Sequence, residues 1–429
     1  MKTLLKQIIV FSLTLEAKLL LKRHRPIIIA ITGSVGKTAM KDAIYTILRP
    51  HVSARKSEKS FNSEIGVPLT VLGLPNAWNN PFLWLKNLLD GLFIALFSKE
   101  YPSYLILETG VDRPGDMDRL TAWMKPDIVV LTRLPDIPVH VEFFSSPEAV
   151  VQEKMKLVTA LRPEGVVIYN HDDPIILREL NNIRHSAFGF GRYAPTHFTA
   201  KADAIYYHDD VPAGISFDVT HLNESVKVKV MGAVGLPSVY TYTGAIAVAM
   251  QCGVSLPAAA AALLDHQVPP GRMRILKGIK GSIIIDDTYN ASPIAVSEAL
   301  RTLKEIAHAG RRIAVLGDML ELGKFSQREH ENIGVIAAST VDILFTIGIR
   351  SQKTAAAALG HGLSEKNIFQ YEDAERAGKE LQMLIQPGDV ILVKASQGIR
   401  AERVVEEVMA EPERAVDLLV RQDSAWQER

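Results

Sequence analysis

The chain has 429 residues, of which 47% are hydrophobic and 22% charged, so it is long enough for two or three domains with ordinary buried cores. Lys+Arg and Asp+Glu both number 48, and this balance gives no support to a nucleic-acid-binding surface, for which a basic excess is expected. The single cysteine, Cys252, excludes disulfides within the chain and a zinc site built from several thiolates.

The first 25 residues are apolar but contain Lys6, Glu16 and Lys18, so no uninterrupted run reaches the roughly 20 residues that a membrane-spanning helix needs. No small-residue cleavage site separates this segment from the strand expected near Pro26, which argues against a signal peptide. We therefore expect residues 1–25 to form an amphipathic helix that packs on the body of the protein or lies on a membrane surface.

Residues 26–266 alternate short runs of Ile, Val and Leu with stretches of helical pattern. This alternation predicts a mostly parallel sheet covered by helices on both faces. Residues 203–231 differ, because polar turns separate three short runs, and they predict a small antiparallel patch at the edge of this first domain. The strands expected before the patch are residues 26–32, 103–109, 127–133 and 165–170.

Two prolines and a glycine in residues 267–274 interrupt the helical run over 244–264, and a second alternation of strands and helices follows. Its five expected strands begin with residues 282–288 and end with residues 389–396. The fold class is therefore α/β, with a central domain over 26–266 and a Rossmann-like domain over 267–429.

Residues 80–97 are strongly apolar, with Lys86, Asn87 and Asp90 forming a narrow polar face at helical spacing. Two interpretations stay open: a core or interface helix, and a helix on a membrane surface. Together with residues 3–21, this segment is the candidate for a peripheral membrane contact.

The motif "TGSVGKT" is typical of a loop that binds phosphate. Its glycines allow a tight turn that directs backbone N–H groups at phosphate oxygens, Lys37 supplies charge, and Thr38 supplies a hydroxyl for Mg²⁺. The usual pattern has a glycine where Ile31 stands, but the expected strand before the loop and the helix after it favour ATP or GTP binding. The expected phosphate-binding residues are Gly33, Ser34, Val35, Gly36, Lys37 and Thr38.

A series of motifs in fixed order resembles the Mur ligase family over residues 26 to about 410: "TGSVGKT", "FNSEIGVPLTVL", "LETGVDRPGDM", "GRMR", "DDTYNASP", "LGDMLELG" and "VKAS". "DDTYNASP" with "LGDMLELG" is typical of the branch that adds D-alanyl-D-alanine to UDP-N-acetylmuramoyl-tripeptide. The resemblance implies an ATP-dependent ligase of peptidoglycan precursor synthesis. Such an enzyme activates a peptide carboxylate as an acyl phosphate, joins it to D-Ala-D-Ala, and releases ADP and phosphate.

The resemblance also implies a site with two Mg²⁺ ions. Glu108 ends an expected strand and matches an acidic metal ligand, and His140 matches a metal-binding histidine. Lys154 matches the lysine that carries a carbamate, with Lys156 as the competing position. Asn62 matches one of two adjacent asparagines in a substrate-facing loop. The implied catalytic residues are Lys37, Lys154, His140 and Asn62, and the implied metal ligands are Thr38, Glu108, His140 and Lys154.

Further nucleotide contacts are implied in both domains. Asn170 resembles a nucleotide-side residue, although a strand-end asparagine also forms turns. Arg272 resembles the arginine that reaches the ATP phosphates, Asp287 the acid that binds the ribose, and Tyr289 and Asn290 the residues that flank the nucleotide.

The second domain is expected to contribute a cleft-facing substrate surface and to cap the ATP bound by the first, so that closure assembles the site in a cytoplasmic monomer. Ala395 replaces the glycine of the family's Lys-Gly-Ser motif. The matched substrate-side residues are Asp318, Glu321, His330, Lys394 and Ser396.

Two departures leave the carboxylate donor open. Only 25 residues precede the first expected strand, too few for the N-terminal domain of roughly a hundred residues that holds the UDP-sugar in the family, and Pro237 stands where a histidine is expected. A different or lipid-linked donor is therefore one alternative. The others are a folylpolyglutamate- or cyanophycin-type ligase, against which "DDTYNASP" argues, and a catalytically reduced binding protein, against which the retained Lys37 and Lys154 argue.

Overall fold

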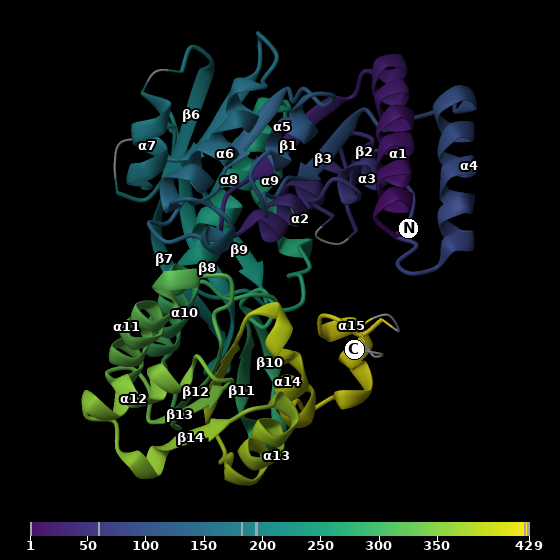
Figure 1. The fold of residues 1–429 in the computed structure, drawn as a ribbon. Helices are drawn as coiled ribbons and strands as arrows, with labels where there is room; N and C mark the ends of the chain where they lie inside the picture. Colours follow the sequence, from purple (N-terminus) through teal and green to yellow (C-terminus); the bar gives the residue numbers. More distant parts are fainter. Residues whose placement is uncertain (1, 59–60, 182, 194–195, 424–425, 427–429) are drawn as a thin grey trace.

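Figure 1 shows the computed structural model, which describes every residue except 1, 59–60, 182, 194–195, 424–425 and 427–429. Within the described residues the chain forms a nine-stranded sheet and then a six-stranded sheet, which confirms the expected α/β class. The first residue of the expected helix 1–25 and the end of the expected domain 267–429 lie outside the described residues. The domain boundaries themselves stay predictions.

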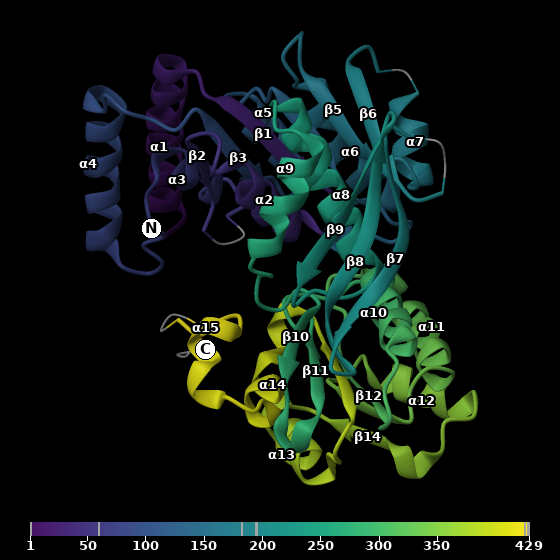
Figure 2. The same cartoon turned by 180° about the vertical axis from the view of Figure 1, so that it is seen from behind.

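The first sheet has the strand order β2-β3-β1-β4-β5-β6-β7-β8-β9. Strands β2 to β7 pair in parallel and β7, β8 and β9 pair antiparallel, so the expected antiparallel patch is present and continues the sheet. It is larger than expected, because β7 and β8 each have 11 residues and their hairpin reaches the second sheet's layer (Figure 2). The strands are β1 (Ile27–Thr32), β2 (Ala54–Lys56), β3 (Tyr104–Glu108), β4 (Ile128–Leu131), β5 (Val166–Asn170), β6 (Ser186–Gly191), β7 (Phe198–His208), β8 (Val211–His221) and β9 (Glu224–Met231).

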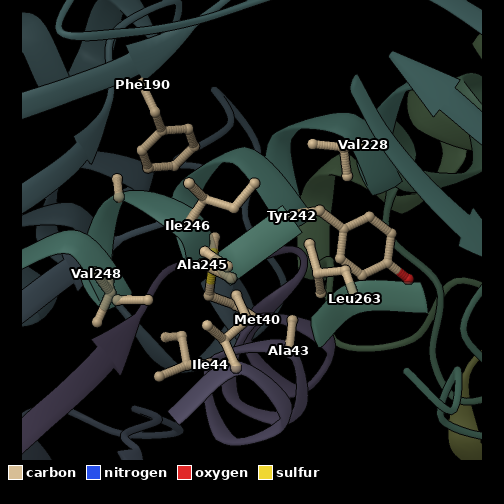
Figure 3. Packing of buried hydrophobic residues seen from close by; sticks show 14 of the residues in the cluster. Met40, Ala43, Ile44, Phe190, Val228, Tyr242, Ala245, Ile246, Val248 and Leu263 are labelled. Atoms are coloured by element: carbon tan, nitrogen blue, oxygen red, sulfur yellow. The ribbon is translucent and has the colours of Figure 1, made fainter. Parts of the chain in front are cut away.

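Helices cover both faces of this sheet. On one face, Met40 and Ile44 of α2 pack against Ile246 of α8 in a buried cluster that also contains Phe190 of β6 (Figure 3). On the other face a second cluster joins α1, α3, α5 and α6 to the strands. The helices are α1 (Lys2–His24), α2 (Lys37–Leu48), α3 (Gly66–Leu72), α4 (Pro81–Phe97), α5 (Asp116–Thr121), α6 (Pro147–Thr159), α7 (Pro174–Leu180), α8 (Leu236–Gln251) and α9 (Leu256–Ala262).

The second sheet has the order β10-β11-β15-β12-β13-β14, in which only β10 is antiparallel to its neighbour. Helices again lie on both faces, with α13 and α14 on one and α10, α11 and α12 on the other. Its strands are β10 (Arg274–Lys277), β11 (Ile283–Asp286), β12 (Arg312–Gly317), β13 (Ile343–Ile347), β14 (Ile368–Tyr371) and β15 (Val390–Lys394). Its helices are α10 (Pro293–Glu305), α11 (Ser326–Ala338), α12 (Gln352–Gly360), α13 (Ala374–Leu384), α14 (Glu402–Val408) and α15 (Ala415–Leu418).

Several helices begin at a polar residue followed directly by proline. The polar side chain accepts hydrogen bonds from the first-turn N–H groups, and proline at the first helical position lacks the N–H that would otherwise be unpaired. These caps fix where the chain turns from loop into helix around the sheet edges. They are Asn80 before α4, Ser146 before α6, Asp173 before α7 and Ser292 before α10.

Helices α1 and α4 lie side by side at one edge of the molecule in both views (Figures 1 and 2). The expected polar face of α4 is divided in the structure: Asn87 is buried and donates to the Pro75 carbonyl at 2.7 Å, while Lys86 and Asp90 pair with each other at 2.6 Å. Among the described residues, no helix is both long and apolar enough to cross a membrane.

The seam between α1 and α4 contains a carboxylate. Glu16 is buried, and a methyl group on Gly91 would lie 2.2 Å from Glu16 Oε2, so the two helices approach closely there. Burial raises the pKa of Glu16 from 4.5 to about 7. The folded protein therefore disfavours the ionised form, so the free energy of unfolding falls as pH rises from about 4.5 to about 7 and then stays low.

We expect Glu16→Gln to stabilise the protein above pH 7, by about 1–2 kcal/mol once solvent screening near the surface is allowed for, and to have little effect below pH 4.5. Thermal unfolding at pH 4.5 and pH 8 measures the difference. Glu100→Gln, at an exposed carboxylate just beyond α4, is the control. A Glu16→Gln effect that does not change with pH would contradict the buried-carboxylate explanation.

Candidate active site

The loop between β1 and α2 adopts positive φ angles at two positions, and both are glycines. Gly33 has φ 142° and Gly36 has φ 85°, both in the region that side chains disfavour. A Cβ on Gly33 would lie 2.0 Å from Thr132 Oγ1, so the loop passes directly against the end of β4. The Ser34 N–H donates to the Arg133 carbonyl at 2.7 Å, which fixes the loop to that neighbouring strand end.

Thr38 and Glu108 meet because their strands are neighbours. Glu108 pairs with Ile31 in the parallel register of β1 and β3, so the carboxyl end of β3 lies beside the loop. The Thr38 hydroxyl donates to Glu108 Oε2 at 2.9 Å, and both residues are buried. From the second domain, Arg272 Nη2 donates to Thr38 Oγ1 at 2.8 Å. Thr38, one of the predicted metal ligands of the first domain, therefore contacts a cation of the second.

Two lysines, the half-buried Lys37 and the buried Lys154, lie against the same backbone carbonyl. Lys37 Nζ donates to the Gly33 oxygen at 2.9 Å, and Lys154 Nζ, from α6, donates to it at 3.3 Å. Burial, and then the charge of Lys37, lower the pKa of Lys154 from 10.5 to about 7. A substantial fraction of Lys154 is therefore neutral near pH 7, and a neutral amine is a nucleophile.

Lys156 has a different environment from Lys154. Its Nζ contacts Asp118 at 2.5 Å and Glu153 at 2.8 Å on the outer side of α6. The hydrogen bonds that Lys156 donates to these carboxylates raise its pKa, so this lysine stays charged. Of the two positions that the sequence leaves open, Lys154 is the one beside the phosphate loop.

His140 connects the two domains. It has φ 69° at the start of a 3₁₀ turn (Val141–Phe143), and its ring lies between two carboxylates. Nε2 is 3.4 Å from Asp112 Oδ1, and Nδ1 is 2.7 Å from Glu321 Oε2 in the second domain. The hydrogen bond from His140 lowers the pKa of the Glu321 carboxyl.

The second domain contributes a buried ion pair. Lys394 Nζ, at the end of β15, contacts Asp287 Oδ2 at 2.6 Å and donates to the Asn290 carbonyl at 2.8 Å. Burial raises the pKa of Asp287, while the charge of Lys394 opposes that rise. The Arg272 guanidinium lies 3.7 Å from the centre of the Tyr289 ring, a cation–π contact that holds the arginine toward the loop.

Many of these groups line a cavity of about 580 Å³, to which both domains contribute residues. A cavity of this size, with backbone amides and cations at one end, accommodates a nucleotide. The predicted site residues that line it are Ser34, Val35, Gly36, Lys37, Asn62, Glu108, His140, Arg272, Asp287, Tyr289, Asn290, Glu321, Lys394 and Ser396.

Six predicted residues do not line this cavity. Gly33 and Thr38 belong to the phosphate-loop motif, and Lys154 donates to the Gly33 carbonyl. The other three are Asn170, Asp318 and His330. Asn170 Oδ1 accepts the Asp172 N–H at 3.0 Å in a turn at the end of β5. Asp318 Oδ1 accepts the Ser351 N–H at 2.7 Å, and His330 Nε2 accepts the Met319 N–H at 3.0 Å. All three are buried, and Asp318 and His330 shape the segment that leads to Glu321 rather than facing the cavity themselves.

Sequence reasoning missed several lining residues, among them Asp112 and Trp426. Asp112 stands four residues beyond Glu108 in the same strand-end loop, a position that could have indicated it. Trp426 is an isolated aromatic near the C-terminus, and no pattern marks it. A second cavity of about 940 Å³ shares Arg272 and Tyr289 with the first and also includes Thr38.

The donor set beside the loop fits Mg²⁺. The Thr38 hydroxyl and the Glu108 carboxylate are hard oxygen donors 2.9 Å apart, and such oxygens together with phosphate are what Mg²⁺ binds in proteins. In the described part of the chain no group of three or more His, Cys, Asp or Glu side chains is placed to hold a metal. An ion here would therefore depend on the nucleotide for its remaining ligands.

Comparison with known proteins agrees with this geometry. The Mur ligase middle domain family matches residues 88–249, and the Mur ligase glutamate ligase domain family matches residues 271–397. The chain is 28% identical to UDP-N-acetylmuramoyl-tripeptide–D-alanyl-D-alanine ligase of Bacillus subtilis, with 90% of this chain and 76% of the relative covered. The ligase of the same name from Mycobacterium leprae is 30% identical, with 87% and 71% covered.

A solved structure shares the fold. The MurF ligase of Thermotoga maritima in complex with ADP matches with a TM-score of 0.76 and 25% identity, covering 94% of this chain and 84% of that one. Because the match covers 94% of this chain, it extends across both sheets. The chain belongs to the Mur ligase family, the ATP-dependent ligases that form carbon–nitrogen bonds.

Proposed function

We propose that this ligase joins D-Ala-D-Ala to a muramoyl tripeptide in peptidoglycan precursor synthesis. The tripeptide carboxylate attacks the γ-phosphorus of ATP, which gives an acyl phosphate and ADP. The amine of the dipeptide then attacks the acyl carbon, so that an amide bond forms and phosphate leaves. The substrates are those in the names of the relatives. In this chain, the proposal is supported by the cavity that residues of both domains line.

The reaction brings a negatively charged carboxylate close to a negatively charged triphosphate. The residues at the loop would reduce the repulsion between them. Lys37 and the loop amides bind the phosphate oxygens, and Arg272 adds a charge from the second domain. Thr38 and Glu108 would hold Mg²⁺, which when bound neutralises phosphate charge. Because Arg272 and Glu321 come from the second domain, closure completes the site and excludes water that would hydrolyse the acyl phosphate.

We infer that Lys154 carries a carbamate. Its neutral amine attacks the carbon of CO₂, an N–C bond forms, and a proton leaves the nitrogen, so that a cation is replaced by an anion. The lowered pKa of Lys154 supports this step, because only the neutral amine reacts. The carbamate, with His140, would supply oxygen and nitrogen ligands for a second Mg²⁺, and Asn62, which lines the cavity, would orient the substrate carboxylate.

The same proposal places the enzyme in the cytoplasm as a monomer that touches the inner face of the membrane peripherally. Residues 3–21 and 80–97 would make that contact. The support is the row of exposed apolar side chains on α1 and α4.

The observation that carries the proposed reaction is the contact of Arg272 with Thr38 across the domain boundary. The test is phosphate release from ATP by the full chain with UDP-linked muramoyl tripeptide, in the presence of D-Ala-D-Ala, D-Ala-D-Lac or single amino acids. We expect release that depends on both the tripeptide and D-Ala-D-Ala, with the amide product visible by mass spectrometry. Release that needs no amine, or that proceeds equally with single amino acids, would contradict the proposed dipeptide transfer.

A further inference from the structure

The outer surface of α4 is apolar along its whole length. Phe82 is 82% exposed and Phe93 65% exposed, and Leu85, Leu89 and Leu96 are exposed between and beyond them. The polar side chains at this surface, Lys86 and Asp90, neutralise each other as an ion pair. A helix that is apolar around most of its circumference is normally covered on all sides, so this one is expected to meet something outside the chain.

Helix α1 adds a second apolar row. Apart from Leu5, its exposed apolar residues succeed one another in steps of four, three, four and four, which places them on one face of the helix. The opposite face, including Leu13 and Leu20, is buried in the protein. The exposed row consists of Leu4, Ile8, Phe11, Leu15 and Leu19.

The two rows form one surface. Arg23, at the end of α1, donates to the Ala95 carbonyl at 3.4 Å and also to the Leu96 carbonyl, while Glu16 lies against Gly91. The helices are therefore parallel, and their C-terminal ends coincide. We call the exposed apolar residues of α1 and α4 together the helix-pair face.

The ends of the helix-pair face carry groups that suit a bilayer. Lys18 and Lys22 lie three and seven residues beyond Leu15, so they continue the same row of α1, and both are exposed. At the other end, Trp84 Nε1 donates to the Trp78 carbonyl at 2.8 Å. Lysines beside apolar side chains reach anionic headgroups, and tryptophans favour the boundary between lipid and water.

We propose that the helix-pair face docks on the surface of a bilayer that contains anionic lipid. Because the inner face of α1 and the Asn87–Gly91–Ala95 seam of α4 pack within the protein, only the outer faces enter the lipid, and the helices lie along its surface. Lys18 and Lys22 then contact the headgroups, which gives a preference for anionic lipid that salt weakens. This refines the peripheral contact of the proposed function.

Docking in this way would place the second cavity next to the bilayer surface. Trp78, Asn79 and Trp84, at the beginning of α4, line the 940 Å³ cavity that also includes Thr38 of the phosphate loop. A substrate or product at the bilayer surface would therefore have a short path to the site.

The experiment is co-sedimentation of the full chain with vesicles of phosphatidylcholine alone and with added phosphatidylglycerol, without nucleotide or substrate. We expect binding to the anionic vesicles, lowered at least about tenfold by Leu89→Gln/Phe93→Gln. Lys18→Gln/Lys22→Gln should remove the preference for anionic lipid. Ile349→Gln/Met383→Gln, which removes equally exposed apolar side chains from the second domain, is the matched control and should bind as the unchanged chain does.

Thermal unfolding of each variant checks that the fold is intact, since all six positions are exposed. Absence of binding to either vesicle would overturn the proposal. So would a dimer, seen by light scattering, that Leu89→Gln/Phe93→Gln dissociates, because a second copy would then cover the face. Vesicle binding needs no ligase chemistry, so failure here leaves the proposed reaction standing, and the converse also holds.

Discussion

Replacing Lys154 with alanine is expected to lower the rate of amide-bond formation by about a thousandfold or more, because the variant would lose the proposed carbamate, the anion that would complete the second metal site. Lys154 is 2% exposed and lies against the Gly33 carbonyl. Its low pKa is what makes the amine available to CO₂ near neutral pH. Phosphate release with the tripeptide and D-Ala-D-Ala measures the loss.

The distinguishing result is rescue. Lys154→Ala leaves a space in which a short carboxylic acid such as acetate can present its oxygens where the carbamate oxygens would lie, and activity should recover in part as the acid is added. Lys156→Ala is the matched control, because that lysine belongs to the same helix but pairs with Asp118 and Glu153 on the outer side. Full activity in Lys154→Ala, or equal losses in both variants, would refute the carbamate at this position.

Replacing Gly33 with alanine is expected to abolish tight ATP binding and to lower the free energy of unfolding by about 3 kcal/mol or more. The new Cβ would lie 2.0 Å from Thr132 Oγ1 and 3.1 Å from the Arg133 backbone nitrogen, and φ 142° disfavours any side chain. The loop would have to leave the end of β4, and its amides would no longer converge on a phosphate. Calorimetric titration with ATP and thermal unfolding measure the two effects.

A double variant separates the two causes. Thr132→Ala removes the hydroxyl that the new methyl group would strike, so Gly33→Ala/Thr132→Ala should recover part of the stability but not the affinity, because the backbone conformation remains disfavoured. Gly253→Ala is the control, since its φ of 86° is also positive but nothing lies within 4 Å of the added Cβ. If Gly33→Ala bound ATP as tightly as Gly253→Ala does, the loop would not have the assigned role.

The sequence predicted the part of the site that depends on strand order. Glu108 and the phosphate loop both follow buried apolar runs, and the carboxyl ends of neighbouring parallel strands meet at one sheet edge. The prediction was less complete for short elements. Strand β2 has three residues, and β10 has four, of which only two are apolar, so neither leaves an apolar run long enough to distinguish it from a loop.

The second domain shows where pattern matching fails to locate side chains. Asp318, Glu321 and His330 occur in one motif, yet only Glu321 lines the cavity, because the chain turns at Glu321 with φ 63° and directs that residue at His140. A motif records that residues matter together and does not say which of them face a ligand. The sequence also did not predict whether the apolar surface of α4 is buried or exposed, since a buried helix and an exposed apolar helix have the same composition.

The two cavities share a wall made of Arg272, Tyr289, Gln397 and Trp426, and all four residues follow the break near residue 270 in the chain. Movement of the second domain would therefore open both cavities at once. Occupancy of one cavity, by favouring the closed arrangement, would raise affinity in the other, and thermodynamic reciprocity requires the coupling to be equal in both directions. Such an enzyme would bind ligands in its two cavities together and release them together in each catalytic cycle.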